Sequence, residues 1–358
     1  MKFKTAGTLE TDGYHKYTRK KRIVILLLAF LIVFLSVAAV NAGSFNLNPY
    51  QVIQSVFGKG NAISGVVIWQ IRMPRILAAV IAGAGLAVAG CVMQNNLRNP
   101  LASPDTLGIS HAAAFGANIA IIVLGAGSIS STSTDAVTIN NPYLVTLCAF
   151  VCSMAATLVI LLLARIRGFS PEAMILAGVA LNSLFMAGTI LIQYFASDVQ
   201  IAAAVFWTFG DLGRVAWREV GILACIVILS FIYFLFKRWD YNALDSGEET
   251  AKSLGVRVER VRQGGMFISA LIAAVAVSFL GIIGFVGLVA PQIMRRIIGG
   301  DHRYLIPASA LMGSALLLFS DTIARTMVAP VVLPVGAITS FFGAPLFLYL
   351  LVRGYQRR

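Results

Sequence analysis

Long apolar runs are the feature that most constrains this chain. Hydropathy divides most of its 358 residues into apolar stretches separated by short polar connections. A helix needs about 20 mostly apolar residues to cross the hydrocarbon core of a bilayer, so each stretch is a candidate transmembrane helix. Charged residues make up only 12% of the chain, whereas a soluble domain carries about 25%. The sequence therefore predicts an all-α polytopic membrane protein.

About ten transmembrane helices are predicted. The predicted spans are residues 23–43, 70–95, 108–126, 143–165, 172–196, 217–236, 265–283, 284–299, 304–323 and 335–352. They form a single transmembrane domain, 23–353, between short tails at 1–22 and 354–358. The first apolar run is longer than the core of a usual signal peptide, which favours an uncleaved first span over a cleaved leader.

The basic residues orient these spans, because Lys and Arg accumulate in the cytoplasmic loops of membrane proteins. With the N-terminus inside, 22 of the 28 Lys and Arg residues fall on the cytoplasmic side. The other six, on the outer side, are Lys59, Arg72, Arg75, Arg214, Arg218 and Arg325. We therefore expect a multi-pass protein of the cell (plasma or inner) membrane, in contact with lipid and with both termini cytoplasmic. The net charge of +13 comes from 28 Lys and Arg against 15 Asp and Glu, and because most of the basic residues lie in predicted cytoplasmic loops, no nucleic-acid partner is expected.

Small residues recur inside several predicted spans, as in the segments 83–90 and 281–287. Glycine and alanine let helix backbones approach closely in a membrane, where burying apolar side chains away from water gives no advantage. The pattern predicts a tightly packed helix bundle.

Motifs of the common catalytic sites are absent from the sequence. There is no G-x-x-x-x-G-K-[ST] phosphate loop, no H-E-x-x-H and no G-x-S-x-G. The four cysteines lie inside apolar runs without metal-ligand spacing, so we interpret them as core residues. We expect no catalytic residue, metal or cofactor on this chain. If it moves a solute uphill, the energy comes from an ion gradient or from another chain.

An ion-coupled carrier is the principal alternative, and the charge distribution disfavours it. Such carriers keep ionisable residues in the middle of the membrane. Here nearly every charge lies at the end of a predicted span, and His111 lies near the cytoplasmic end of the third. A membrane scaffold or a channel is a more distant alternative.

The stretch ALDSGEETAKSLGVRVERVR, residues 243–262, is unusually polar for this chain and is predicted to be cytoplasmic. Ser246 and Glu249 fit a capping box, and Gly255 follows Leu254 where a glycine would end a helix. Apolar residues recur at helical spacing: Leu244, Ala251, Leu254, Val258 and Val261. The stretch predicts two short helices, which either lie on the protein's own surface or dock a partner protein.

Two arginines, Arg72 and Arg75, stand in IWQIRMPR on the predicted outer side, and Arg325 follows the ninth span. Their side chains either extend to lipid headgroups or form a docking patch for acidic residues of an external partner.

Five blocks of sequence, in order, resemble the permease subunits of ABC importers for ferric siderophores, haem and vitamin B12, the FecCD-type family. They are RMPRILAAVIAGAGLAVAGCVMQNNLRNPLASPDTLGIS (72–110), FSPEAMILAGVALNS (169–183), ALDSGEETAKSLGVRVERVR (243–262), GIIGFVGLVAPQIMRRIIGGDHRYLIPASALMG (281–313) and DTIARTMVAPVVLPVGAITSFFGAPLFLYLL (321–351). The resemblance implies a type II ABC importer permease of ten helices, paired with a second copy or a related permease. It also implies ABC ATPase subunits that hold ATP and Mg, and an extracytoplasmic substrate-binding protein.

The resemblance assigns roles to particular residues. Residues 243–262 match the coupling helices that contact the ATPase, with Leu244, Ser246, Glu249, Leu254, Gly255, Val258 and Arg260 as the expected contacts. Arg72, Arg75 and Arg325 match arginines that face glutamates of the binding protein. A cytoplasmic gate is implied at Asn99, Phe169, Ser170 and Pro171, although FSPEA is also a good helix start. Ferric siderophore is the expected cargo, with haem or cobalamin as alternatives.

Overall fold

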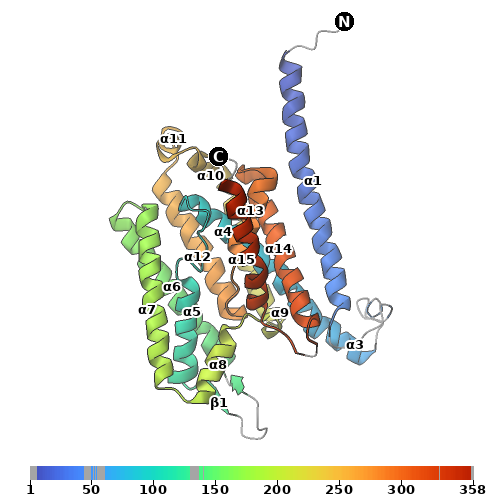
Figure 1. Cartoon of the computed structure of the whole chain (residues 1–358), viewed down its shortest axis with the longest axis vertical. Coiled ribbons are helices and arrows are strands. Elements are labelled where there is room, and N and C mark those ends of the chain that lie inside the picture. Colours follow the sequence, from blue (N-terminus) through green and yellow to red (C-terminus); the bar gives the residue numbers. More distant parts are fainter. Residues whose placement is uncertain are drawn as a thin grey trace.

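The computed structural model describes residues 6–43, 50, 52, 54, 61–129, 137–139, 141–329 and 331–355. The predicted outer residue Lys59 and most of the predicted C-terminal tail lie outside these residues. The chain forms one bundle of helices that run between two ends (Figure 1). Both ends of the described chain lie at the end that carries α10 and α11, which agrees with the predicted even number of crossings.

The helices account for most of the described chain. In order they are α1 (Ala6–Asn41), α3 (Ala62–Val66), η1 (Val67–Arg72), α4 (Met73–Asn96), α5 (Ile109–Asn118), η2 (Ile119–Val123), α6 (Pro142–Ile166), α7 (Pro171–Tyr194), α8 (Asp198–Thr208), η3 (Leu212–Arg214), α9 (Trp217–Phe236), α10 (Arg238–Asp245), α11 (Glu248–Ser253), α12 (Val258–Leu280), α13 (Val286–Ile298), α14 (His302–Thr326) and α15 (Val335–Tyr355). Two short strands, β1 (Gly127–Ile129) and β2 (Val137–Ile139), pair antiparallel at the opposite end from α11.

Each of the ten predicted spans coincides with a helix, but the count of ten crossings is not confirmed. Among the described residues, seven helical segments are long and apolar enough to cross a membrane. The remaining three predicted spans correspond to α5 with η2, to α13 and to α15, whose described apolar segments are shorter. The chain is therefore a multi-pass, predominantly helical membrane protein with at least seven candidate spans among the described residues.

Helix α4 is the centre of the bundle. It continues α3 and η1 into one long, mostly buried apolar segment, Ala62–Asn96, and it packs against α9, α12, α13 and α14. The π-helical turns of η1 come directly before Pro74, whose ring and missing N–H do not fit a regular α-helix. Pro74 therefore accounts for the change from π-helical to α-helical geometry between η1 and α4.

Glycine pairs set the close approach of α4 to its neighbours. A Cβ added at Gly90 would lie 1.8 Å from the carbonyl oxygen of Gly287 in α13. A Cβ added at Gly83 would lie 2.4 Å from the carbonyl oxygen of Gly313 in α14. No side chain fits between these backbones, so the predicted tight packing of small residues is confirmed at these two crossings.

The substitution Gly90→Ala tests this packing. The added methyl group must displace the Gly287 backbone, and overpacking of this kind costs roughly 1–3 kcal/mol or more. We expect a lower midpoint of thermal unfolding in detergent, measured by a thermal-shift assay. The matched control is Gly221→Ala in α9, where an added Cβ meets nothing within 4 Å. Equal midpoints for the two variants would contradict this account.

Candidate functional site

The polar stretch at 243–262 forms the end of α10, all of α11 and the start of α12. The first of the two short helices predicted in this stretch is confirmed as α11, Glu248–Ser253. It ends as predicted at Gly255, whose positive φ of 82° suits glycine and whose N–H donates to Lys252 O at 2.9 Å. The rest of the stretch was expected to form a second short helix. Instead it begins the long helix α12.

The predicted capping box is wrong. The N-cap of α11 is Gly247, with a φ of 116°, and it makes no side-chain capping bond. Ser246 instead ends α10 as its C-cap, and its hydroxyl lies 3.5 Å from the carbonyl oxygen of Asn242. Helix α11 therefore begins one residue later than predicted, because the short turn after α10 requires a positive φ that glycine adopts readily.

The predicted contact residues divide between an inner and an outer face. Leu244 and Val258 are buried against the bundle, as are Ala251 and Val261. Exposed residues of the predicted set are Ser246, Glu249, Leu254, Gly255 and Arg260. Leu254 is 68% exposed at a point where charged residues surround it in the sequence. The outer face of α11 thus offers one large apolar side chain within a polar surface.

Asp245, the last residue of α10, anchors this helix pair to the bundle. Its carboxylate accepts a hydrogen bond from Asn95 Nδ2 of α4 at 2.6 Å and lies 3.4 Å from His302 Nδ1 of α14. Arg295 Nη1 of α13 is 3.9 Å away. One carboxylate contacts three helices of the bundle, which fixes the position of α10.

Asp301, just before α14, is a second anchor. Asn242 of α10 donates to Asp301 Oδ1 at 3.0 Å, and Arg303 Nη2 lies 2.7 Å from Oδ2. Burial raises the pKa of Asp301, but the hydrogen bonds from Arg303 and Asn242 outweigh it and lower the pKa to about 2. Because the folded pKa is depressed, this carboxylate stabilises the fold at neutral pH, and that stabilisation is lost only as the pH falls from about 4 towards 2.

Arg262 links α11 to the segment that precedes α7. Its side chain is buried, and its Nη2 lies 2.9 Å from Glu248 Oε2 of α11. Its Nη1 donates to the carbonyl oxygen of Phe169 at 3.4 Å. The pKa of Glu248 is lowered, mainly by the hydrogen bond from Lys252 and also by the charge of Arg262. The carboxylate of Glu248 therefore stays ionised between two bases.

The predicted gate residues lie at the same end of the bundle. Ser170 is the N-cap of α7, accepting a hydrogen bond from Ala173 N–H at 3.3 Å, and Pro171 is the first helical residue. Phe169 is buried, and Asn99 Oδ1 accepts from Leu101 N–H at 2.9 Å. The interpretation of FSPEA as a helix start is confirmed, and a gating role for these residues stays a prediction.

The three arginines predicted to dock an external partner are buried at the opposite end. Their exposed fractions are 4% for Arg72, 8% for Arg75 and 6% for Arg325. Asp321, fully buried in α14, receives a hydrogen bond from Arg75 Nε at 2.8 Å and one from Arg325 Nε at 3.0 Å. Arg75 Nη2 also lies 3.3 Å from Asp211 Oδ1. In this conformation the guanidinium groups form an internal cluster.

The same cluster holds the C-terminal end of α1. Arg325 Nη1 donates to the carbonyl oxygen of Ala42 at 3.0 Å, and Arg72 Nη1 donates to that of Val40. These carbonyls have no partner inside the helix, and cations are stabilising near the negative end of a helix dipole. The arginines therefore join α4, α14 and α1.

Sequence reasoning missed the carboxylates of this cluster. Asp321 precedes Arg325 by four residues, a spacing that brings two side chains together on a helix, and this signal was available. Asp211 and the pairing of Glu248 with Arg262 depend on residues far apart in the sequence, so no local pattern indicates them.

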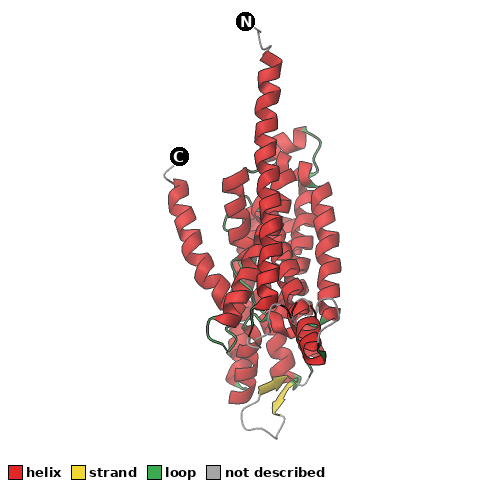
Figure 2. Ribbon diagram, turned by 90° about the vertical axis from the view of Figure 1, so that its right-hand side faces the viewer, coloured by secondary structure: helices red, strands yellow, loops and turns green. Residues whose placement is uncertain are grey.

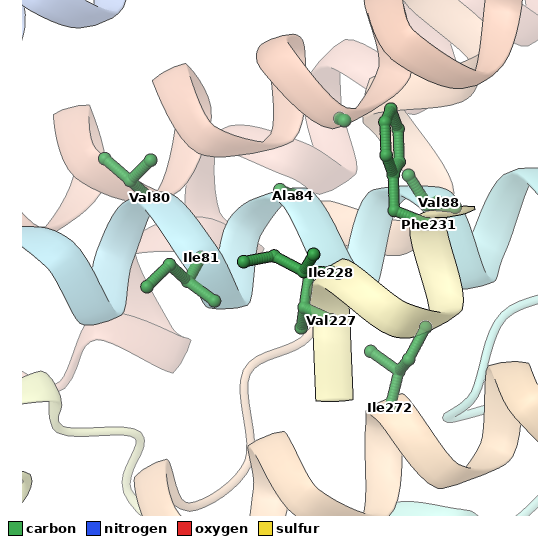
Figure 3. A pocket seen from close by; sticks show the side chains of 10 residues that line it. Val80, Ile81, Ala84, Val88, Val227, Ile228, Phe231 and Ile272 are labelled. Atoms are coloured by element: carbon green, nitrogen blue, oxygen red, sulfur yellow. The ribbon is translucent and has the colours of Figure 1, made fainter. Parts of the chain in front are cut away.

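An apolar cavity of ≈220 Å³ lies between α4, α9, α12 and α14. Figure 3 shows Val80, Ala84 and Val88 of α4 lining it together with side chains of α9 and α12. All of its lining side chains are apolar. Such a lining offers no hydrogen bond or charge with which to recognise a polar solute.

The Asp321→Asn substitution tests the buried cluster. Removing one charge leaves two buried guanidinium groups poorly paired, and breaking a buried ion pair costs roughly 3–5 kcal/mol. We expect a marked fall in the thermal midpoint in detergent, partly restored by adding Arg325→Gln. Asp198→Asn, at an exposed site in the first turn of α8, is the control and should lose less than about 1 kcal/mol. A midpoint unchanged in Asp321→Asn would contradict the cluster.

Comparison with known proteins gives one consistent result. The family model described as the FecCD transport family matches residues 28–353. MJ0087 of Methanocaldococcus jannaschii, named as an ABC transporter permease protein, is 58% identical over 96% of this chain and 98% of its own length. The Fe(3+)-citrate import system permease protein YfmE of Bacillus subtilis is 36% identical over 94% and 97%. Other relatives are named for hemin transport and vitamin B12 import.

A solved structure agrees with these relatives. An inward-facing metal-chelate type ABC transporter superposes with a TM-score of 0.78 at 29% identity, covering 93% of this chain and 99% of the other. The family match covers more than half of the chain, and the curated relatives match along nearly their whole length. The chain belongs to the FecCD transport family of ABC importer permeases.

Proposed function

We propose that this chain is the membrane-spanning subunit of an importer that moves ferric siderophores, driven by separate ATPase subunits. We further propose that the chain crosses the membrane ten times, that both of its termini are cytoplasmic, and that two copies form a homodimer. The observation that carries it is the outer face of α11, where Leu254 is exposed on a helix pair anchored to the bundle through Asp245 and Asp301. A rigidly held apolar side chain among polar neighbours is suited to dock another protein.

The partner on this surface is an ATPase that holds ATP and Mg. The sequence contains no phosphate loop of its own, so transport against a gradient needs an energy source elsewhere. Movement of α11 would act on the bundle through two connections: Arg262, which contacts the connection before α7, and Asp245, which contacts α4, α13 and α14. The proposed coupling residues are the exposed members of the predicted set. The buried side chains of Leu244 and Val258 hold these residues against the bundle.

The second copy is supported by two poorly covered helices. The apolar window of α7 is only 6% buried, and α15 leans away from the bundle towards its C-terminal end (Figure 2). A path for the substrate between two such subunits needs no enclosed site within one of them. This fits the apolar lining of the cavity in Figure 3, which offers nothing to hold an iron chelate.

An extracytoplasmic binding protein is proposed to deliver the substrate at the end of the bundle that carries β1 and β2. Arg72, Arg75 and Arg325 remain the proposed docking residues, and their burial implies that docking loosens their pairing with Asp321 or acts through the surface that they support. Ferric siderophore is proposed as cargo, supported by the name of YfmE, with haem or cobalamin as alternatives supported by other relatives.

ATP-dependent uptake is the experiment that tests this function. Proteoliposomes containing this chain with its ATPase and binding protein should accumulate the ferric siderophore when ATP is supplied. Uptake should persist after ionophores dissipate proton and sodium gradients. Uptake by this chain alone, driven by such a gradient, would establish the ion-coupled alternative instead.

Leu254→Asp tests the docking surface. A charge at this position removes the apolar contact, and truncation of a central interface residue costs about 2 kcal/mol or more of binding free energy. We expect the ATPase to dissociate during size-exclusion chromatography while the thermal midpoint of the permease stays unchanged. Leu124→Asp, at an exposed leucine of the opposite end, is the matched control and should retain the ATPase. Equal retention in both variants would exclude α11 as the contact.

A further inference from the structure

A polar cavity opens beside α11, and no ligand is assigned to it above, although its lining includes the predicted gate residues Ser170 and Pro171. Its volume is ≈410 Å³, and its charged lining consists of Arg98, Arg167, Arg262, Glu172 and Glu248. It lies where α6 ends and α7 begins, at the end of the bundle that carries α10 and α11. Charged side chains at the ends of membrane-spanning helices lie within reach of lipid headgroups.

The charges of this cavity favour an anion. Glu248 is already paired with Arg262 and Lys252, at 2.9 and 3.0 Å. The side chains of Arg98 and Arg167 form no ion pair or side-chain hydrogen bond with the part of the chain that the structure describes, although the charge of Arg98 acts on nearby Asp245. Glu172 is the one remaining carboxylate of the lining. Two exposed guanidinium groups therefore line the cavity without a directly bonded carboxylate.

Two further groups point to the same chemistry. The Nε of Arg262 is buried without a hydrogen-bond partner, although the other guanidinium nitrogens of this residue are used. Ser170 and Pro171, the N-cap and first residue of the 24-residue helix α7, also line the cavity. The N-terminus of a helix is positive because its first N–H groups have no partner inside the helix, and it attracts phosphate and carboxylate groups.

Backbone strain is concentrated beside the cavity. Arg98 and Phe169 have φ angles of 46° and 55°, two of the three positive values among the described non-glycine residues. Each such residue costs roughly 1–2 kcal/mol, and glycine would remove the strain. Strained residues concentrate at ligand sites, so this pair marks the cavity as a candidate site.

We propose that this cavity binds one phosphate-bearing anion, clasped by Arg98 and Arg167 against the N-terminus of α7. Guanidinium groups bind phosphate through paired hydrogen bonds, and basic pockets between transmembrane helices bind anionic headgroups. The bound group would bridge α11 to the connection between α6 and α7. The same chemistry is supplied by the headgroup of an anionic phospholipid or by free phosphate.

Lipid binding is measured by native mass spectrometry of the purified chain in detergent, titrated with phosphatidylglycerol or phosphatidylcholine. Wild type should retain one phosphatidylglycerol and should bind phosphatidylcholine more weakly, because choline carries a positive charge. The double variant Arg98→Gln/Arg167→Gln should bind phosphatidylglycerol about tenfold more weakly, the loss expected for one charged hydrogen bond or more. The control Arg19→Gln/Arg22→Gln changes the net charge equally at exposed sites of α1 and should bind as wild type.

Free phosphate is tested separately by the shift in thermal midpoint with inorganic phosphate at constant ionic strength. A shift that disappears in Arg98→Gln/Arg167→Gln identifies free phosphate as a ligand, whereas phosphatidylglycerol binding without such a shift identifies the lipid. Glu172→Gln removes the opposing carboxylate and should tighten binding of the identified ligand, a gain that misfolding does not produce. The proposal is overturned if the double variant binds both probes as wild type does, or if wild type binds neither. These readouts do not depend on transport.

Discussion

Close backbone contact around α4 is the constraint on which the rest of the structure depends. Helices in a bilayer gain nothing by hiding apolar side chains from water, so they are held by van der Waals packing and polar contacts. At Gly90 and Gly287, and again at Gly83 and Gly313, the backbones of neighbouring helices touch directly. These crossings fix α13 and α14 against α4, and the polar anchors at both ends are built on these three helices.

The two ends use their charges differently. At the end of α11, carboxylates hold a short helix pair in place: Asp245 contacts three helices, and Glu248 is shared between Arg262 and Lys252. At the opposite end, arginines surround the buried Asp321. They also donate hydrogen bonds to the carbonyl oxygens of Val40 and Ala42 at the end of α1. The contacts of Asp245 and of Arg262 are the direct side-chain links from α10 and α11 to the bundle that the coupling proposed above would use.

Much of this could be predicted from the sequence, because hydropathy and helix signals act locally. The apolar runs coincide with helices, and Gly255 ends α11 as its conformational freedom predicts. The capping box failed because the chain has only two residues in which to turn from α10 to α11, and Gly247 alone adopts the φ needed. The burial of Arg75 was unpredictable, because its partners Asp211 and Asp321 come from distant parts of the chain.

The fastening of α1 has a consequence for bilayer thickness. At the start of the apolar part of the helix Lys21 lies 3.9 Å from Asp301, and just beyond the last helical residue Arg325 binds the carbonyl oxygen of Ala42. The 21 helical residues from Lys21 to Asn41 span about 31 Å, close to the roughly 30 Å of a bilayer's hydrocarbon core. Because both ends are tied to the same bundle, α1 cannot tilt freely to match a thicker or thinner membrane. Lipids around this helix must adjust their own thickness, so the protein is matched to membranes of one hydrophobic depth.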